Sequence, residues 1–158
     1  MAVFNRHQQE VAKLPQDEQT FSAIGRFIVE FSNLEMVLKL WVAETVNLSS
    51  EFHDQIMTHD FAMLCNIAQT VLPQDMKEGA GQALKPIIGR FHEMNTHRVR
   101  IAHGWWLFGT SGVRHVTRQK LRSEIHYDNA VEIAALADSI DALDLELREW
   151  HRSYRLKS

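Results

Sequence analysis

The sequence predicts an all-α protein, an up-and-down bundle of about four to five helices with a small β hairpin before the last helix. Long segments carry apolar residues at intervals of three and four, which line one face of an α-helix. The connections between these segments are short, and short connections favour antiparallel neighbours. A glycine-bearing stretch at Gly109–Gly112, between the apolar Trp105, Leu107 and Phe108 and the segment Val113–Gln119, indicates the turn of a hairpin.

The composition predicts a single domain over residues 1–158, with 45% hydrophobic and 23% charged residues. A net charge of −3 argues against bulk electrostatic capture of nucleic acid but is compatible with a local basic patch. The single Cys65 excludes an internal disulfide and suits a reducing compartment. No apolar run approaches about 18 residues and the N-terminus lacks a signal-peptide pattern, so we expect a cytoplasmic protein without membrane contact.

A central helix is predicted from Thr20 to about Asn47, after a short helical pattern in residues 1–15 that stops at Pro15. A second apolar set widens its stripe around much of the circumference, as is typical of a helix that is central or buried on two sides. The main stripe is Phe21, Ile24, Phe27, Ile28, Phe31, Leu34, Leu38, Trp41 and Val42, and the second set is Val29, Met36, Val37 and Leu40.

Two more helices are predicted in the middle of the chain. Residues 48–72 form one, with a break near Thr58–Asp60, and Pro73 follows its end. The next runs from about residue 81 to residue 103, and Gly104 stops it because glycine takes the left-handed conformation at little cost. The apolar stripes are Phe61, Leu64, Ile67, Ala68 and Val71 in the first helix, and Leu84, Ile87, Ile88, Phe91, Met94, Ile101 and Ala102 in the second.

The last third of the chain predicts the hairpin and a final helix. Residues 105–119 have the pattern of two strands around a turn, and residues 120–127 add a third short strand. A helix follows from Asp128 to about Tyr154, with Asp128 as its cap or as the charge that complements its dipole. Its apolar stripe is Ile133, Leu136, Ala137, Ile140, Leu143, Leu147 and Trp150.

Two charged residues lie at positions of the apolar stripes where a buried apolar residue is expected. Arg98 is near the middle of the stripe of its helix, and Glu35 lies on the main stripe of the central helix. Each charge buried alone would cost several kcal/mol, whereas a hydrogen-bonded pair offsets much of that cost. We therefore predict that Glu35 faces Arg98 and orients its guanidinium group.

Nine histidines raise the question of a metal site, but their spacing argues against one. His92 and His97 lie five residues apart, about 140° around a helix, whereas the zinc-protease motif needs an interval of four. His53-Asp54 and His59-Asp60 are interpreted as surface polar residues, since no complementary His and Asp occur nearby. There is also no phosphate loop and no cysteine pair. The sequence thus predicts no metal and no cofactor.

The segment His97–Gly104, after one helix and before the last, resembles the Arg-x4-His signature of the HEPN domain superfamily, and residues 31–38 are similar to its early helix. The resemblance implies a helical bundle that forms a homodimer. Many members are metal-independent endoribonucleases of toxin–antitoxin, defence or RNA-processing systems, and others are non-catalytic binding modules. The family usually has a polar residue directly after the arginine, where this chain has Val99.

The residue types suit RNA cleavage without metal, which needs a base, an acid and positive charge at the phosphate. Arg98 is the expected phosphate clamp and His103 the proton-transfer group, shared between two chains of a dimer. Arg100 and Trp105 are the expected RNA contacts, through the backbone and through base stacking. The leading function is a toxin-type endoribonuclease with RNA as substrate and an antitoxin protein as partner. The alternative is a non-catalytic interaction or nucleotide-binding module, in which Arg98 pairs with a buried Glu and His103 bonds the helix end.

Overall fold

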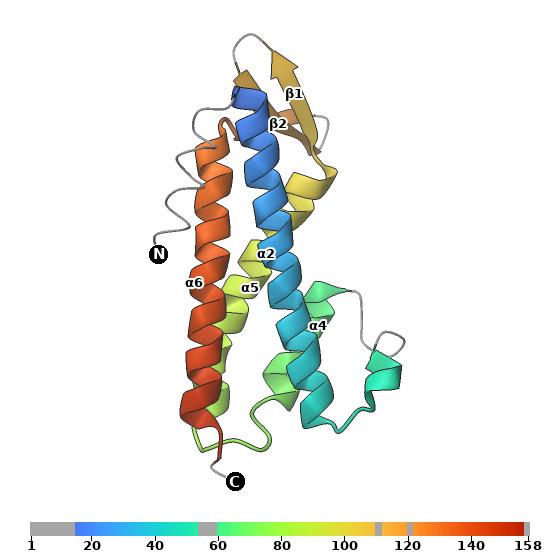
Figure 1. The fold of residues 1–158 in the computed structure, drawn as a ribbon, viewed down its shortest axis with the longest axis vertical. Coiled ribbons are helices and arrows are strands. Elements are labelled where there is room, and N and C mark those ends of the chain that lie inside the picture. Colours follow the sequence, from blue (N-terminus) through green and yellow to red (C-terminus); the bar gives the residue numbers. More distant parts are fainter. Residues whose placement is uncertain (1–14, 54–59, 110–111, 120–121, 157–158) are drawn as a thin grey trace. The chain divides into compact units, whose positions relative to one another are not determined.

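The computed structural model describes residues 15–53, 60–109, 112–119 and 122–156. Within these ranges the chain is mainly helical with a small antiparallel sheet before the last helix, which confirms the predicted fold class (Figure 1). The helical pattern predicted for residues 1–15 lies almost wholly outside the described residues, as does most of the break predicted near residues 58–60. The elements are α2 (Gln16–Thr45), η1 (Ser50–Phe52), α4 (Phe61–Val71), α5 (Ala80–His103), β1 (Trp105–Gly109), β2 (Gly112–Gln119), β3 (Arg122–Tyr127) and α6 (Ala130–Tyr154).

The chain divides into two compact units. The first contains the start of α2 up to Glu30 and residues 97–139, which include the end of α5, the sheet and the start of α6. The second contains residues 31–96 and the chain from Ile140 onward. The prediction of one domain over residues 1–158 stays a prediction.

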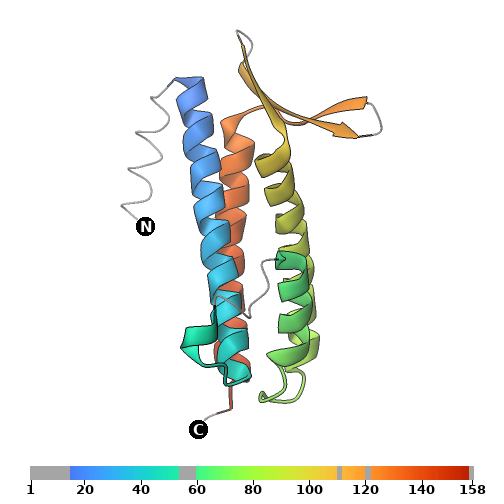
Figure 2. The ribbon, with the colours of Figure 1, turned by 90° about the vertical axis from the view of Figure 1, so that its right-hand side faces the viewer.

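The first unit holds a three-stranded antiparallel sheet in the order β1-β2-β3. The pairing of β1 with β2 runs from Trp105 opposite Val116 to Gly109 opposite Gly112. Strand β3 then pairs with β2, with a register irregularity beside His115 (Figure 2). The predicted hairpin and its third strand are therefore confirmed.

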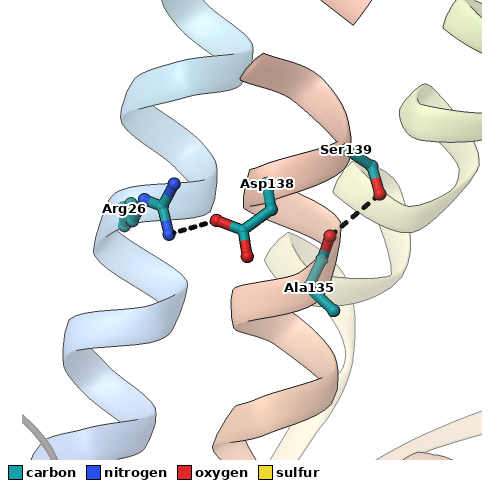
Figure 3. Close-up of polar contacts among 4 residues, drawn as sticks. All are labelled: Arg26, Ala135, Asp138 and Ser139. Atoms are coloured by element: carbon teal, nitrogen blue, oxygen red, sulfur yellow. Dashed lines mark hydrogen bonds and ion pairs between the residues drawn. The ribbon is translucent and has the colours of Figure 1, made fainter. Parts of the chain in front are cut away.

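Apolar side chains of α2, α5 and α6 form the core of this unit with one tyrosine from β3. At its surface Arg26 of α2 forms an ion pair with Asp138 of α6 at 2.7 Å, and Ser139 donates to the carbonyl oxygen of Ala135 (Figure 3). Because the Asp138 side chain is 57% exposed, solvent screens this pair and its contribution to stability is small. The buried apolar residues are Ala23, Phe27, Ile101, Tyr127, Ile133 and Ala137.

The cap of α6 differs from the prediction. Asn129, not Asp128, accepts a hydrogen bond from the backbone N–H of Glu132 at 3.1 Å. The Glu132 carboxylate in turn accepts from the Asn129 amide at 3.1 Å and from the backbone N–H of Asp128 at 3.3 Å. This reciprocal arrangement is similar to a capping box, and it requires its polar side chain at the residue directly before the first helical turn.

The second unit has a core of helical stripes close to those predicted. Phe61 of α4 contacts Phe31 of α2, with ring centroids 4.5 Å apart, and Phe91 of α5 at 6.3 Å. On α4, Cys65 is fully buried while Ile67, which the pattern assigned to the stripe, is half-buried. The buried residues are Phe31, Leu34, Leu38, Val42, Ala43, Phe61, Leu64, Cys65, Ala68, Leu72, Ala80, Leu84, Ile87, Ile88, Phe91, Met94, Ile140, Leu143, Leu147 and Trp150.

The second apolar set of α2 remains largely uncovered within this chain. Val29 is 57% exposed, Met36 55% and Leu40 47%. The helix is therefore buried along the part of its main stripe from Phe27 to Val42, while Phe21 of that stripe is 57% exposed, and its predicted burial on two sides is not met by the described residues. No helix in the described part of the chain is both long enough and apolar enough to cross a membrane.

Candidate functional site

The end of α5 is fixed by the residues that follow it. The helix ends at His103 as predicted, and the backbone N–H of Gly104 donates to the carbonyl oxygen of Arg100 at 2.8 Å. The indole N–H of Trp106 donates to the carbonyl oxygen of Ile101 at 3.2 Å, which satisfies one of the acceptors left over at a helix C-terminus. The left-handed conformation expected of Gly104 is wrong, since Gly79 is the one glycine with positive φ among the described residues.

Arg98 lies on the buried side of α5, as its position in the apolar stripe predicted. It is half-buried, and Ile101, three residues further on and on the same side, is 2% exposed. The Nε atom of the guanidinium is itself buried. Any ligand of Arg98 would therefore be bound by the terminal nitrogens of the guanidinium group.

A second face of α5 carries three ionisable residues, His97, Arg100 and His103. Successive members are three residues apart, and each lies about 60° from the next around the helix, so the three form one continuous stripe. His103 is exposed, and the other two are half-buried. Arg98 and His103 are five residues apart, about 140° around the helix, so they lie on different sides of it. The structure thus groups His103 with Arg100 rather than with Arg98.

Tyr127 at the end of β3 joins this stripe to the sheet. Its hydroxyl lies 2.7 Å from Nδ1 of His97, and Arg100 lies close enough to affect its pKa. The side chain is 4% exposed, and Trp106 stacks on its ring with centroids 6.4 Å apart and planes 15° apart. Burial raises the pKa of Tyr127, Arg100 opposes this effect, and Glu132 adds to it. Tyr127 is therefore a buried hydroxyl of β3 that contacts His97 of α5.

His97 and Tyr127 were not among the residues that the sequence predicted for the site. The spacing of His97, Arg100 and His103 at intervals of three was visible in the sequence and could have shown the stripe. The contact with Tyr127 was not visible, because it joins residues 30 positions apart through the register of the sheet. No local signal marks such a pair.

The two tryptophans of β1 have different surroundings. Trp105 is 68% exposed, whereas Trp106 is half-buried against Tyr127 and bonded to the helix end. Neighbouring residues of a strand point to opposite faces, so one indole packs and the other is presented to solvent. Trp105 therefore has the exposure that its predicted role in base stacking requires.

Glu35 belongs to the second unit. Its carboxylate forms an ion pair with Nζ of Lys39, one turn further along α2, at 2.6 Å. It also contributes to the raised pKa of Cys65, which burial, then Asp60, then Glu35 bring to about 12. Arg98 belongs to the first unit, and the predicted pairing of Glu35 with Arg98 stays a prediction.

The described residues contain no cluster of three or more His, Cys, Asp or Glu side chains that could hold a metal ion. Comparisons of the chain with protein-family models, with curated proteins and with solved structures found no match.

Proposed function

We propose that the end of α5 is the active site of a metal-independent endoribonuclease of toxin or defence type. The observation that carries this proposal is the exposed His103 on the last turn, beside Arg100 on the same face and followed by the exposed Trp105. A proton-transfer group, a fixed cation and an aromatic surface are thus close together along the chain. These are the groups that binding and cleaving a single-stranded RNA requires.

The chemistry is an attack of the ribose 2′-oxygen on the adjacent phosphorus. A base removes the 2′-hydroxyl proton, the O2′–P bond forms and the P–O5′ bond breaks. An acid gives its proton to O5′, which leaves a 2′,3′-cyclic phosphate and a 5′-hydroxyl. His103 of one copy acts as the base and His103 of a second copy as the acid.

Arg98 supplies positive charge to the phosphate. Its guanidinium stays protonated when partly buried, and its planar shape suits two phosphate oxygens at once. Its terminal nitrogens make the contact because Nε is buried. Arg100, which lies near Tyr127, contributes a second charge to the RNA backbone.

A homodimer would bring two copies of His103 to one cleft. The support for it is the apolar surface that α2 leaves uncovered, at Phe21 and Val29 in the first unit and at Met36 in the second. Each of these side chains is more than half exposed, and apolar patches of this kind on one helix are often covered by a second subunit.

A non-catalytic interaction or nucleotide-binding module is the second candidate. It is favoured by the separation of Arg98 and His103 on different sides of α5, together with the half-burial of Arg98. In this case Arg98 stabilises the first unit, and His103 and Trp105 form part of a surface for a partner. The two candidates differ in whether His103 is needed for a chemical reaction.

The experiment is an RNA cleavage assay with purified protein and excess chelator, reading out 2′,3′-cyclic phosphate ends. Wild-type protein should cleave, while Arg98→Ala and His103→Ala should each lose at least a hundredfold in rate. His92→Ala, on the same helix but about three turns before His103, is the matched control and should cleave like the wild type. Cleavage by His103→Ala at the wild-type rate would exclude the endoribonuclease proposal.

A further inference from the structure

The second unit contains a cavity of about 220 Å³, to which three separate parts of the chain contribute. They are the end of α2, the segment between α4 and α5, and the end of α6. The cavity uses none of the residues proposed to contact RNA, because those residues belong to the first unit. Cavities that hold drug-sized ligands measure about 300–1,000 Å³, so this one suits a smaller molecule. Its lining includes Glu44, Asn47, Asp75, Met76, His151 and Arg155.

The wall at the end of α2 is fixed by a helix-ending turn. Asn47 has a positive φ of 53°, and its backbone N–H donates to the carbonyl oxygen of Glu44 at 3.1 Å. The backbone N–H of Leu48 donates to the carbonyl oxygen of Ala43 at 2.9 Å. These two bonds around a left-handed residue form a Schellman motif, which holds Glu44 and Asn47 at the edge of the cavity.

The other two walls are bonded to each other. Met76 and Arg155 form an isolated antiparallel bridge between the segment after α4 and the end of α6. Beside it, the backbone N–H of Lys77 donates to the carbonyl oxygen of Tyr154 at 2.9 Å. The backbone itself therefore shapes the cavity, and a ligand that enters it does not have to order the chain.

The cavity carries two negative charges and one positive charge. The carboxylates belong to Glu44 and Asp75 and the guanidinium to Arg155, and all three residues are exposed. Within the described part of the chain, no oppositely charged side chain lies within ion-pair distance of any of them. His151 adds no charge at neutral pH, because burial and then Arg155 lower its pKa, against the opposing effect of Glu44. A ligand can therefore pair with all three charges without displacing a protein partner.

We propose that this cavity binds a free α-amino acid with a basic side chain, such as lysine or arginine. These molecules carry two positive charges and one negative charge, the reverse of the cavity. Their two cationic groups pair with Glu44 and Asp75, and their carboxylate pairs with Arg155, whose planar guanidinium suits two carboxylate oxygens at once. The methylene groups of the ligand contact Met76, whose flexible side chain adapts to apolar ligands.

The charges also argue against other small ligands. A nucleotide or another polyanion would bring its phosphates toward two carboxylates, and like charges repel. A diamine would satisfy Glu44 and Asp75 but would leave Arg155 without a partner. The described residues contain no group of three or more His, Cys, Asp or Glu side chains that could hold a metal ion there.

The test is a titration of the nitrogen-15-labelled full chain with L-lysine, followed by the backbone amide signals. Two further ligands each lack one charged group of lysine: cadaverine has no carboxylate, and norleucine has no side-chain ammonium. The variants are Arg155→Gln and Asp75→Asn. Their matched controls are Arg152→Gln and Glu78→Gln, which remove exposed charges close in sequence but outside the lining.

We expect L-lysine to shift the amide signals of Asn47, Asp75 and Arg155 with a Kd of about 1–10 mM, since exposed charge pairs are individually weak. Arg155→Gln should weaken lysine binding about three- to tenfold and leave cadaverine binding unchanged, because cadaverine has no group for the guanidinium. Asp75→Asn should weaken lysine binding by a similar factor, and both control variants should bind lysine like the wild type.

Three results would overturn the proposal, and none of them bears on the proposed RNA site. The first is the absence of shifts at the cavity at L-lysine concentrations up to about 50 mM. The second is binding of cadaverine or norleucine as tight as that of lysine, which would remove the role of the carboxylate or of the basic side chain. The third is an equal loss of lysine binding in Arg155→Gln and Arg152→Gln, which would show that only the overall charge matters.

Discussion

His103 and Arg98 lie on different sides of α5. They are five positions apart along the chain, which corresponds to a rotation of about 140° around the helix axis. His103 is exposed to solvent, and Arg98 lies half-buried on the same side as Ile101. Two groups arranged in this way do not converge on one phosphate within a single helix. The proposed site therefore depends on a second copy of the chain.

Substitution at the exposed apolar face of α2 should disrupt that dimer. We expect Met36→Glu to yield a folded monomer that no longer cleaves RNA, because a carboxylate cannot be buried in an apolar interface without a large cost. Light scattering at micromolar concentration gives the mass, and circular dichroism checks the helical content. Val131→Glu is the matched control, since Val131 is 74% exposed on α6 and lies outside the face. A wild-type protein that is monomeric and fully active would contradict the shared site.

The role of Glu35 can be separated from its ion pair with Lys39. That pair is partly exposed and spans one helical turn, which is worth only about 0.3–0.5 kcal/mol. We expect Glu35→Gln to cost less than about 1 kcal/mol of unfolding free energy in urea yet to weaken RNA binding, because the predicted hold on Arg98 is lost. Lys39→Gln removes the same ion pair and should leave RNA binding unchanged. If the two variants bind RNA equally, Glu35 acts through Lys39 alone.

The stability of the protein should fall in mild acid because of His151. Its imidazole stacks on Trp41 with ring centroids 4.2 Å apart, and burial lowers its pKa, Arg155 lowers it further, and Glu44 opposes both. The unfolded chain then binds a proton more readily, so the free energy of unfolding decreases as pH falls below about 6.5. His151→Phe keeps an aromatic ring against Trp41 and should flatten this dependence, measured by urea unfolding at a series of pH values. His92→Phe, as the control, should keep the slope, and an unchanged slope in His151→Phe would contradict the assignment.

The periodic features of the fold were readable from the sequence because each helix repeats its burial pattern over several turns. The core stripe of α5 from Leu84 to Ile101, its end at His103 and the three strands followed from local pattern alone, whereas Ala102, also assigned to the stripe, is exposed. The capping residue of α6 could not be read in the same way, because Asp128 and Asn129 are both good caps and only the backbone decides which one precedes the first turn. Contacts between residues far apart in the sequence could not be predicted either, as the hydrogen bond between His97 and Tyr127 shows.

The sequence predicted which types of residue form the candidate site, but not how their side chains are arranged in space. Arg98 was rightly placed on the buried side of its helix and Trp105 proved exposed. The grouping of His97, Arg100 and His103 on one face was implicit in their spacing. The Arg-x4-His pattern instead grouped His103 with Arg98.

The central claim is that two copies of His103 serve one metal-independent site, and defined heterodimers test it most directly. Wild-type and His103→Ala chains with different tags are combined, the mixed dimers are purified, and RNA cleavage is measured in excess chelator. Each proton transfer contributes about 10²–10⁴-fold to the rate, so a mixed dimer with one His103 should retain about 1% of the wild-type rate or less. Cleavage at half the wild-type rate would show that each chain has a complete site of its own, and would contradict the account.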